Sequence, residues 1–255
     1  MWGTDADPRT LAHSAVIVVE QDCLDRLWRA IPQTSGTAEW TIIAQGAAAT
    51  GSGSTPGLSF GSRHAFLAEA ALLPIAREAC WIESFEHGWL FLIAGADSTG
   101  LLIAVGARPE DLLKSSRSLA HQVSSIREVQ AEVPAYPRIT SPLFGDGWLA
   151  CGTAAMMLDP LCGDGSGHAV REAILATAVL RGGATPDLLE HYQARLRLAF
   201  ERHLTLCRSY YVSGCSGPWW EREIALLDEG LEWTRAHAIA KWRYRLDELD
   251  LVPLS

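Results

Sequence analysis

A short stretch rich in glycine, proline and aspartate, residues 148–167, has the residue types and spacing best suited to hold a ligand. An apolar run ends at Gly152, Asp159-Pro160 follows, and three glycines then stand at alternate positions: Gly163, Gly165 and Gly167. Because glycine has no Cβ, backbone amides there can approach a flat or anionic ligand without intervening side chains. The stretch is therefore a candidate binding site. The alternative is a tight turn between a strand and a helix, in which the glycines serve only the backbone conformation.

Three side chains could move protons near this stretch or at a strand turn: His87, Asp159 and His168. Histidine titrates near neutral pH and a carboxylate can act as a base, but all three are also common structural residues. Cys151 and Cys162 flank the motif and are expected to be small buried apolar residues. The sequence therefore identifies no catalytic acid or base.

The composition restricts the classes of partner. The 255 residues carry a formal net charge of -9, which argues against nucleic acid or an anionic membrane surface, since either needs a basic face. The 10 tryptophans lie among acidic and apolar neighbours and are expected to pack in the core or line a pocket. The 6 cysteines form no Cys-x-x-Cys pair, so we expect reduced thiols and no metal site. With no signal peptide and no run of membrane-spanning length, the sequence predicts a soluble cytoplasmic protein that acts on a small organic substrate.

The first part of the chain is expected to alternate between strands and helices. Apolar and β-branched runs predict strands at 15–20 and 40–44, and apolar residues at helical spacing predict a helix at 22–31. A loop rich in small residues covers 46–61. Within this loop, Gly51-Ser52-Gly53 lacks the third glycine of a dinucleotide-binding fingerprint, and the proline that follows stops any helix from opening there.

Residues 64–105 have a pattern typical of antiparallel sheet. Turn residues such as His87-Gly88 separate four runs that predict strands: 65–73, 80–85, 89–93 and 101–105. A helix is predicted next, over 110–126. Pro134 and Pro137 then interrupt the chain before the strand that leads into the glycine stretch.

Helical segments are predicted after the glycine stretch. The first, 168–180, is almost entirely apolar or small and is expected to be a buried helix, whose N-terminal amides and dipole favour an anionic or electron-rich group over residues 165–167. Thr185-Pro186 begins a long second helix. Its apolar face consists of residues at helical spacing: Leu188, Leu189, Tyr192, Leu196, Phe200, Leu204, Cys207 and Tyr211. After Gly214 another segment begins, and a final helical region includes Trp233, Trp242 and Tyr244.

The motif resembles a signature of the flavin-dependent monooxygenase superfamily, in the branch that contains tryptophan halogenases, geranylgeranyl-type reductases and maturation hydroxylases for peptide-derived quinone cofactors. That signature is close to Gly-Asp-Ala-Ala, then Asp-Pro-Leu and a glycine turn. Here it reads Gly152-Thr153-Ala154-Ala155 and Asp159-Pro160-Leu161-Cys162-Gly163-Asp164-Gly165. Residues 87–94 are similar to the family's Gly-Trp-x-Trp-x-Ile-Pro strand, and Tyr210-Tyr211 with Pro218-Trp219-Trp220 is similar to its C-terminal tail. The resemblance therefore covers most of the chain.

The resemblance implies an FAD-dependent monooxygenase that hydroxylates an aromatic, tryptophan-like substrate, small or carried on a peptide, through a flavin hydroperoxide. A flavin reductase or a partner chain would complete such a system. The resemblance also implies that FAD contacts residues of the motif: Gly152, Thr153, Asp159, Pro160, Gly163, Gly165, Ser166 and Gly167. Trp89 and Phe91, in the strand motif, are candidate substrate contacts.

Three departures from the family pattern limit what the resemblance implies. The family's first βαβ unit, with its Gly-x-Gly-x-x-Gly, is missing from the sequence, so we expect a truncated chain or one completed by a second chain. Thr153 replaces an aspartate that bonds the ribityl chain, which should lower flavin affinity. Phe91 or Leu92 and Ala94 replace the tryptophan and proline of the strand motif, which argues against halogenation. The alternatives are a non-catalytic flavoprotein fragment or subunit, a halogenase and a geranylgeranyl-type reductase.

The expected architecture is mixed α/β (α+β). Residues 1–60 and 141–183 are predicted to form part of a Rossmann-like FAD/NAD(P)-binding domain, the first as a remnant and the second as the ring-contacting motif with its helix. Residues 61–140 are predicted to form a substrate domain with an antiparallel sheet. Residues 184–255 are predicted to form a C-terminal helical region.

Overall fold

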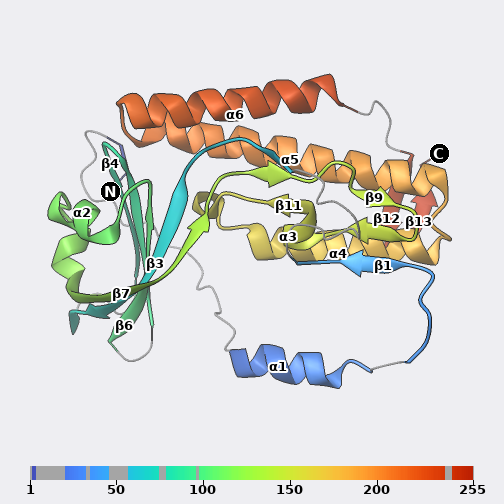
Figure 1. The fold of residues 1–255 in the computed structure, drawn as a ribbon, viewed down its shortest axis with the longest axis horizontal. Helices are drawn as coiled ribbons and strands as arrows, with labels where there is room; N and C mark the ends of the chain where they lie inside the picture. Colours follow the sequence, from blue (N-terminus) through green and yellow to red (C-terminus); the bar gives the residue numbers. More distant parts are fainter. Residues whose placement is uncertain are drawn as a thin grey trace.

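The computed structural model describes residues 2–3, 21–32, 35–45, 57–74, 79–95, 98–238 and 243–254. The predicted strand at 15–20 and the Gly51-Ser52-Gly53 segment lie outside these ranges. In Figure 1 an antiparallel sheet lies at one end of the molecule, short strands and helices lie at the other, and two long helices run along both. The mixed α/β architecture predicted from the sequence is confirmed.

The antiparallel sheet has five strands in the order β4-β5-β6-β3-β7. Their bounds are β3 His64–Leu72, β4 Cys80–Phe85, β5 Gly88–Ala94, β6 Thr99–Val105 and β7 Val123–Pro134. The four strands predicted between 65 and 105 are therefore confirmed, to within two residues at their ends. Alternate residues of β5 serve two cores: Leu90 and Leu92 pack with Leu112 and Leu119, whereas Trp89 packs toward the long helices.

The predicted helix over 110–126 is wrong after its first turns. Helix α2 spans only Pro109–Lys114, a 3-10 turn η2 covers Leu119–Gln122, and β7 then pairs with β3. The buried carboxylate of Glu83 accounts for the break, because it accepts hydrogen bonds from the Ser116 hydroxyl and from the backbone amides of Arg117 and Leu119 at 2.6, 2.8 and 3.0 Å. A long-range partner on β4 thus ends a helix that the local pattern favours.

The other end of the molecule contains one short parallel strand pair. Strand β1, Thr41–Ile43, runs parallel to β10, Trp148–Ala150, which pairs on its other side with β9, Phe144–Gly145. A second small sheet has the order β11-β8-β2, with bounds Met156–Met157, Arg138–Ile139 and Leu58–Ser59. Helix α1, Gln21–Ala30, confirms the predicted helix at 22–31 and lies apart from these sheets in Figure 1.

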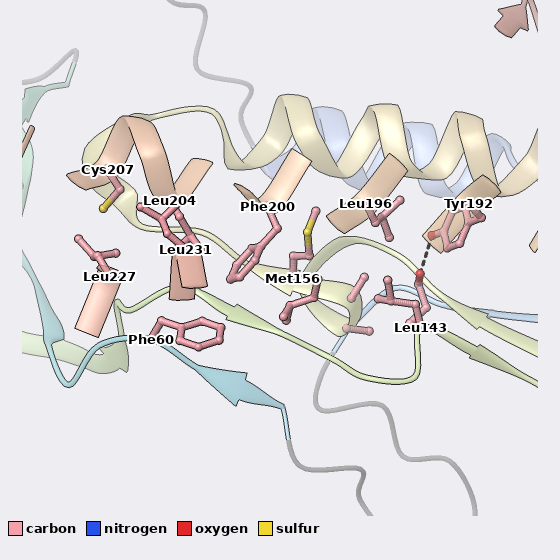
Figure 2. Packing of buried hydrophobic residues seen from close by; sticks show 14 of the residues in the cluster. Phe60, Leu143, Met156, Tyr192, Leu196, Phe200, Leu204, Cys207, Leu227 and Leu231 are labelled. Carbon is pink, nitrogen blue, oxygen red and sulfur yellow. Dashed lines mark hydrogen bonds between the residues drawn. The ribbon is translucent and has the colours of Figure 1, made fainter. Parts of the chain in front are cut away.

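Three helices follow in the chain: α4 Gly165–Arg181, α5 Pro186–Gly214 and α6 Pro218–Ala236, with α6 packed along α5. All eight residues of the predicted apolar face of α5 are buried. Figure 2 shows the residues of α5 facing Phe60, Leu143 and Met156 on the sheet side. One core therefore runs from the small sheets under α5 to the inner face of the five-stranded sheet. The predicted domain boundaries stay a prediction.

Two predictions for the C-terminal half need correction. The helix at 168–180 is buried on one face only, since Val170 is 60% exposed. The final helical region ends with α6 at Ala236, and Tyr244 lies in a hairpin of β12, Tyr244–Asp247, and β13, Asp250–Pro253. A tight turn with Glu248 at a positive φ of 53° reverses the chain there, which helical periodicity does not reveal. Trp242 lies outside the described residues.

None of the described helices is long and apolar enough to cross a membrane.

Candidate functional site

The glycine stretch forms a compact connection that leads from β10 into α4. Helix α3, Gly152–Ala155, follows β10, and a 3-10 turn η3, Pro160–Cys162, precedes α4. Two glycines here serve the backbone: Gly152 has a φ of 54° and a Cβ there would lie 3.0 Å from the Ala44 carbonyl oxygen, and Gly163 ends η3 with a φ of 67°. At these two positions the structure supports the alternative interpretation, in which glycine serves the backbone conformation of a tight turn.

The first residues of α4 are different, because nothing in the described chain requires glycine there. Gly165, Ser166 and Gly167 are exposed, and a Cβ at Gly165 would meet no described atom within 4 Å. A Cβ at Gly167 would touch only the Arg171 side chain, at 3.6 Å. Glycine lowers helix stability by about 0.5–1 kcal/mol relative to alanine, so two unrequired glycines leave open space at a cost. The amides of these three residues also lack a carbonyl partner within the helix.

Asp159 holds this connection to the interior of the protein. Asp159 as a whole residue is 2% exposed, and its Oδ1 accepts a hydrogen bond from the Leu161 amide at 2.8 Å as the cap of η3. Oδ2 accepts hydrogen bonds from Arg63 Nε at 2.6 Å and from the Tyr211 hydroxyl at 3.0 Å, and the Asp159 amide donates to His203 Nε2 at 2.9 Å. These contacts anchor the turn, and the predicted roles of Asp159 in flavin binding and proton transfer stay predictions.

Arg63 is the centre of a buried charge cluster, which we define as Arg63, Asp159 and Glu223. Arg63 Nη1 donates to Glu223 Oε2 at 2.7 Å, and none of the three side chains has exposed surface. Burial opposes the charge of Arg63, but its neighbours Tyr211, Asp159, Cys207 and Glu223 raise its pKa well above the ordinary value. The Ser62 hydroxyl donates a further bond to Glu223 Oε1 at 2.6 Å.

The sequence patterns do not identify Arg63 and Glu223. A signal for Glu223 exists: it lies three residues after Trp220 and four before Leu227, on the apolar face of α6. A charged residue at such a position indicates a buried partner. Arg63 carries no comparable signal, because it precedes β3 in a segment without periodicity. The partners come together only through the fold, since 96 residues separate Arg63 from Asp159 and 160 separate it from Glu223.

A second cluster adjoins the first and comprises Cys162, His203 and Cys207. The two Sγ atoms and one ring nitrogen of His203 all lie within 4.8 Å of one another. Hydrogen bonding with Cys207 and with His203 lowers the pKa of the Cys162 thiol to about 7, although burial raises it, whereas burial raises the pKa of Cys207 well above its ordinary value. Cys151 is buried as expected, but Cys162 is partly exposed and lies among polar groups.

The remaining predicted FAD contacts are accessible. Thr153 is exposed, and its hydroxyl donates to the Ala44 carbonyl oxygen at 3.4 Å. Pro160 is partly exposed. His168 Nε2 lies 2.9 Å from Asp164 Oδ2 beside the start of α4. Thr153, Pro160 and His168 lie close to the glycines in the sequence and belong to the same connection between β10 and α4. Their roles in binding stay predictions.

The predicted residues of the strand motif lie in the five-stranded sheet. Trp89 is 1% exposed, and its indole Nε1 donates to the Tyr211 hydroxyl at 3.2 Å, which links β5 to the Asp159 anchor. Phe91 is partly buried. His87 is exposed in the turn between β4 and β5, with its Nε2 4.0 Å from Glu86 Oε1. The structure therefore connects Trp89 to the glycine connection through Tyr211, and their substrate and catalytic roles stay predictions.

Glu172, on α4, holds the first glycine of the connection. Its Oε2 accepts a hydrogen bond from the Gly152 amide at 2.7 Å. Burial raises the pKa of Glu172 to about 7, although the bond from Gly152 lowers it. Because the folded-state pKa lies above the ordinary value of 4.5, ionisation of this carboxyl costs stability as the pH rises from about 4.5 to 7.

Glu172→Gln is therefore expected to stabilise the fold at pH 8 by about 2 kcal/mol and to have little effect at pH 4. The amide oxygen of glutamine still accepts the Gly152 bond but carries no charge. Urea denaturation at both pH values measures the difference, with Glu190→Gln, an exposed position on α5, as control. An equal effect of Glu172→Gln at both pH values would contradict the account.

Comparisons with known proteins support the fold. The sequence matches no protein-family model and no curated protein. Among solved structures, the chain is similar to CmlS, a flavin-dependent halogenase, with a TM-score of 0.55 and 20% identity over 78% of this chain and 42% of that chain. BrvH, a flavin-dependent halogenase from Brevundimonas sp. BAL3, gives a TM-score of 0.54 and 14% identity, over 74% of this chain and 42% of that chain. The myxobacterial chondrochloren halogenase CndH gives 0.52 and 17%, over 78% and 55%.

This chain thus has the fold of a portion of a flavin-dependent halogenase, as the resemblance in the motif predicted. It spans between 42% and 55% of the length of these three proteins.

Proposed function

We propose that the connection from Asp159 to Gly167 is the ring-facing part of a flavin site, and that the chain takes part in FAD-dependent oxidation. The observation that carries this proposal is the start of α4, where three exposed residues have amides without a partner in the helix and two of them are glycines that the fold does not require. A flavin ring is flat, and its pyrimidine edge is electron-rich and gains negative charge on reduction, which suits the positive end of a helix dipole.

The residues present fit such a group in distinct ways. The amides of Gly165, Ser166 and Gly167 would donate to its electron-rich edge, and the hydroxyl of Thr153 would offer one neutral hydrogen bond in place of a carboxylate. Asp159, fixed by Arg63, would hold the turn in place beneath it. A reduced flavin activates molecular oxygen, while the protein supplies orientation and excludes water.

Hydroxylation of an aromatic, tryptophan-like substrate, small or carried on a peptide, is the reaction we propose. The departure of Phe91, Leu92 and Ala94 from the strand motif favours hydroxylation over halogenation. A flavin reductase as electron source and a cytoplasmic location, where the described cysteines remain thiols, belong to the same proposal. As a second proposal, the chain is a flavoprotein subunit that a partner chain completes. Its span of about half the length of its structural neighbours favours this second proposal.

Equilibrium titration of the purified chain with FAD tests the first proposal. We expect bound flavin with an altered visible spectrum and quenched fluorescence. Absence of binding at saturating FAD would overturn the stand-alone flavoprotein and favour the subunit. The reaction is tested with reduced FAD, oxygen and an indole-containing peptide: a product with one added oxygen atom supports hydroxylation, whereas a halogenated product in the presence of bromide contradicts it.

A further inference from the structure

Two cysteines from distant parts of the chain face each other beside the proposed flavin site. Cys162 ends the turn η3, Cys207 lies on α5, and their Sγ atoms are within 4.8 Å. His203 lies one turn before Cys207 on the same face of α5 and reaches both sulfurs. No disulfide joins the two cysteines, so the described structure presents a dithiol.

The hydrogen bonding of His203 favours thiol chemistry over metal binding. The Asp159 amide donates to His203 Nε2 at 2.9 Å, so this nitrogen acts as an acceptor and the proton of the neutral ring is on Nδ1. With one ring nitrogen occupied and the other protonated, the ring has no free lone pair for a cation while this bond is intact. Nδ1 makes no hydrogen bond in the described structure and lies 3.8 Å from Asp164 Oδ1, so its proton is available to a thiolate formed nearby.

A fixed positive charge also lies beside the pair. Arg63 Nη2 is 3.6 Å from Cys207 Sγ. This charge opposes the effect of burial on Cys207, but burial dominates and keeps the pKa of Cys207 well above its ordinary value. The Cys162 thiol, whose pKa is lowered by hydrogen bonding with Cys207 and His203, is therefore the one that forms the thiolate, the reactive form in attack on peroxides and disulfides. The Arg63 guanidinium and the His203 ring do not depend on flavin, because Arg63 belongs to the buried charge cluster and His203 to α5.

We propose that Cys162 and Cys207 form a peroxide-reactive dithiol that closes to a disulfide between the glycine connection and α5. In the first step the Cys162 thiolate attacks a peroxide oxygen: an S–O bond forms, the O–O bond breaks, and hydroxide leaves to become water after protonation. In the second step the Cys207 sulfur attacks the Cys162 sulfur: an S–S bond forms, the S–O bond of the sulfenic acid breaks, and the hydroxide leaves as water with the proton of the Cys207 thiol. Overall, two thiols are oxidised and one hydrogen peroxide is reduced to two waters.

Burial determines the order of the two cysteines. Cys162 is partly exposed and can meet peroxide first, whereas Cys207 is fully buried and resolves the sulfenic acid. Closure requires the sulfurs to approach to about 2 Å. Space for this shift exists on the solvent side of the turn, because a Cβ at Gly163, the residue after Cys162, would meet no described atom within 4 Å.

The test treats the reduced full-length chain with hydrogen peroxide in the absence of flavin and maps peptides by mass spectrometry without reductant. We expect a linked Cys162–Cys207 peptide. Cys162→Ser should slow peroxide consumption about tenfold or more, because the more accessible thiolate is lost. Cys207→Ser should accumulate a sulfenic acid at Cys162 that a dione reagent traps. Cys80→Ser and Cys215→Ser are the controls and should react as the parent does.

Circular dichroism confirms that each variant is folded before its reaction is measured. Both thiols remaining free under excess peroxide would overturn the proposal, as would a disulfide that involves Cys80 or Cys215 instead. One tightly held Zn²⁺ per chain, lost in Cys162→Ser and His203→Gln, would also overturn it, because the three side chains would then be metal ligands.

Discussion

Arg63→Met is expected to destabilise the fold by about 3–5 kcal/mol. The methionine leaves Asp159 and Glu223 as two buried carboxylates without a counter-charge, and it removes the donors at 2.6 and 2.7 Å. Because Asp159 caps η3, the same change should loosen the glycine connection and weaken flavin binding. Urea denaturation followed by circular dichroism measures the change in the free energy of unfolding.

Arg222→Met provides a matched control. Arg222 also lies near Glu223, with its Nε 3.9 Å from Oε1, but its side chain is exposed, so we expect a loss of less than about 0.5 kcal/mol. The double variant Arg63→Met with Glu223→Leu should lose less free energy of unfolding than the sum of the losses of the two single variants. Each single change leaves the other residue's charge unpaired, and the double change removes both charges. Equal losses for Arg63→Met and Arg222→Met would contradict the central position of Arg63.

The double variant Gly165→Ala with Gly167→Ala is expected to bind FAD about tenfold or more weakly, equal to about 1.4 kcal/mol, while the free protein gains about 1–2 kcal/mol of stability. Neither added methyl group clashes with the described chain, so helix propensity alone acts on the free protein. In the flavin complex the methyl groups would occupy the space through which the amides reach the ring. Titration with FAD and thermal unfolding without FAD measure the two effects.

Gly36→Ala is the control for this prediction, since a Cβ at Gly36 also meets no described atom within 4 Å but lies outside the glycine connection. It should leave FAD affinity unchanged. A double variant that binds FAD as the parent does would show that the flavin lies elsewhere. A double variant that is less stable than the parent would show instead that the fold itself requires these glycines.

The parts of the fold that the sequence predicts well are those that local periodicity encodes. The face of α5 from Leu188 to Tyr211 repeats apolar residues at helical spacing, and β5 and β6 are apolar runs bounded by turn residues. The helix prediction is wrong after Lys114 because the contacts that end the helix come from Glu83, more than thirty residues earlier in the chain. The prediction of a helix in place of the C-terminal hairpin is wrong because a turn at Glu248 reverses the chain, and composition does not reveal that turn.

The candidate site divides in the same way. The glycines and Asp159 are adjacent in sequence, so a motif can identify them together. Arg63 and Glu223 approach Asp159 only when β3 and α6 pack on the connection, and no spacing rule predicts such a contact. Cys-x-x-Cys spacing likewise does not reveal the pair Cys162 and Cys207, because only the fold brings these two thiols together.

Hydrogen exchange of the backbone amides at the start of α4, measured with and without FAD, tests the central claim most directly. The amides of Gly165, Ser166 and Gly167 have no carbonyl partner within the helix and should exchange quickly in the free protein. The account predicts that saturating FAD slows exchange at these three amides. FAD binding that leaves their exchange unchanged, or that protects only other segments, would contradict it.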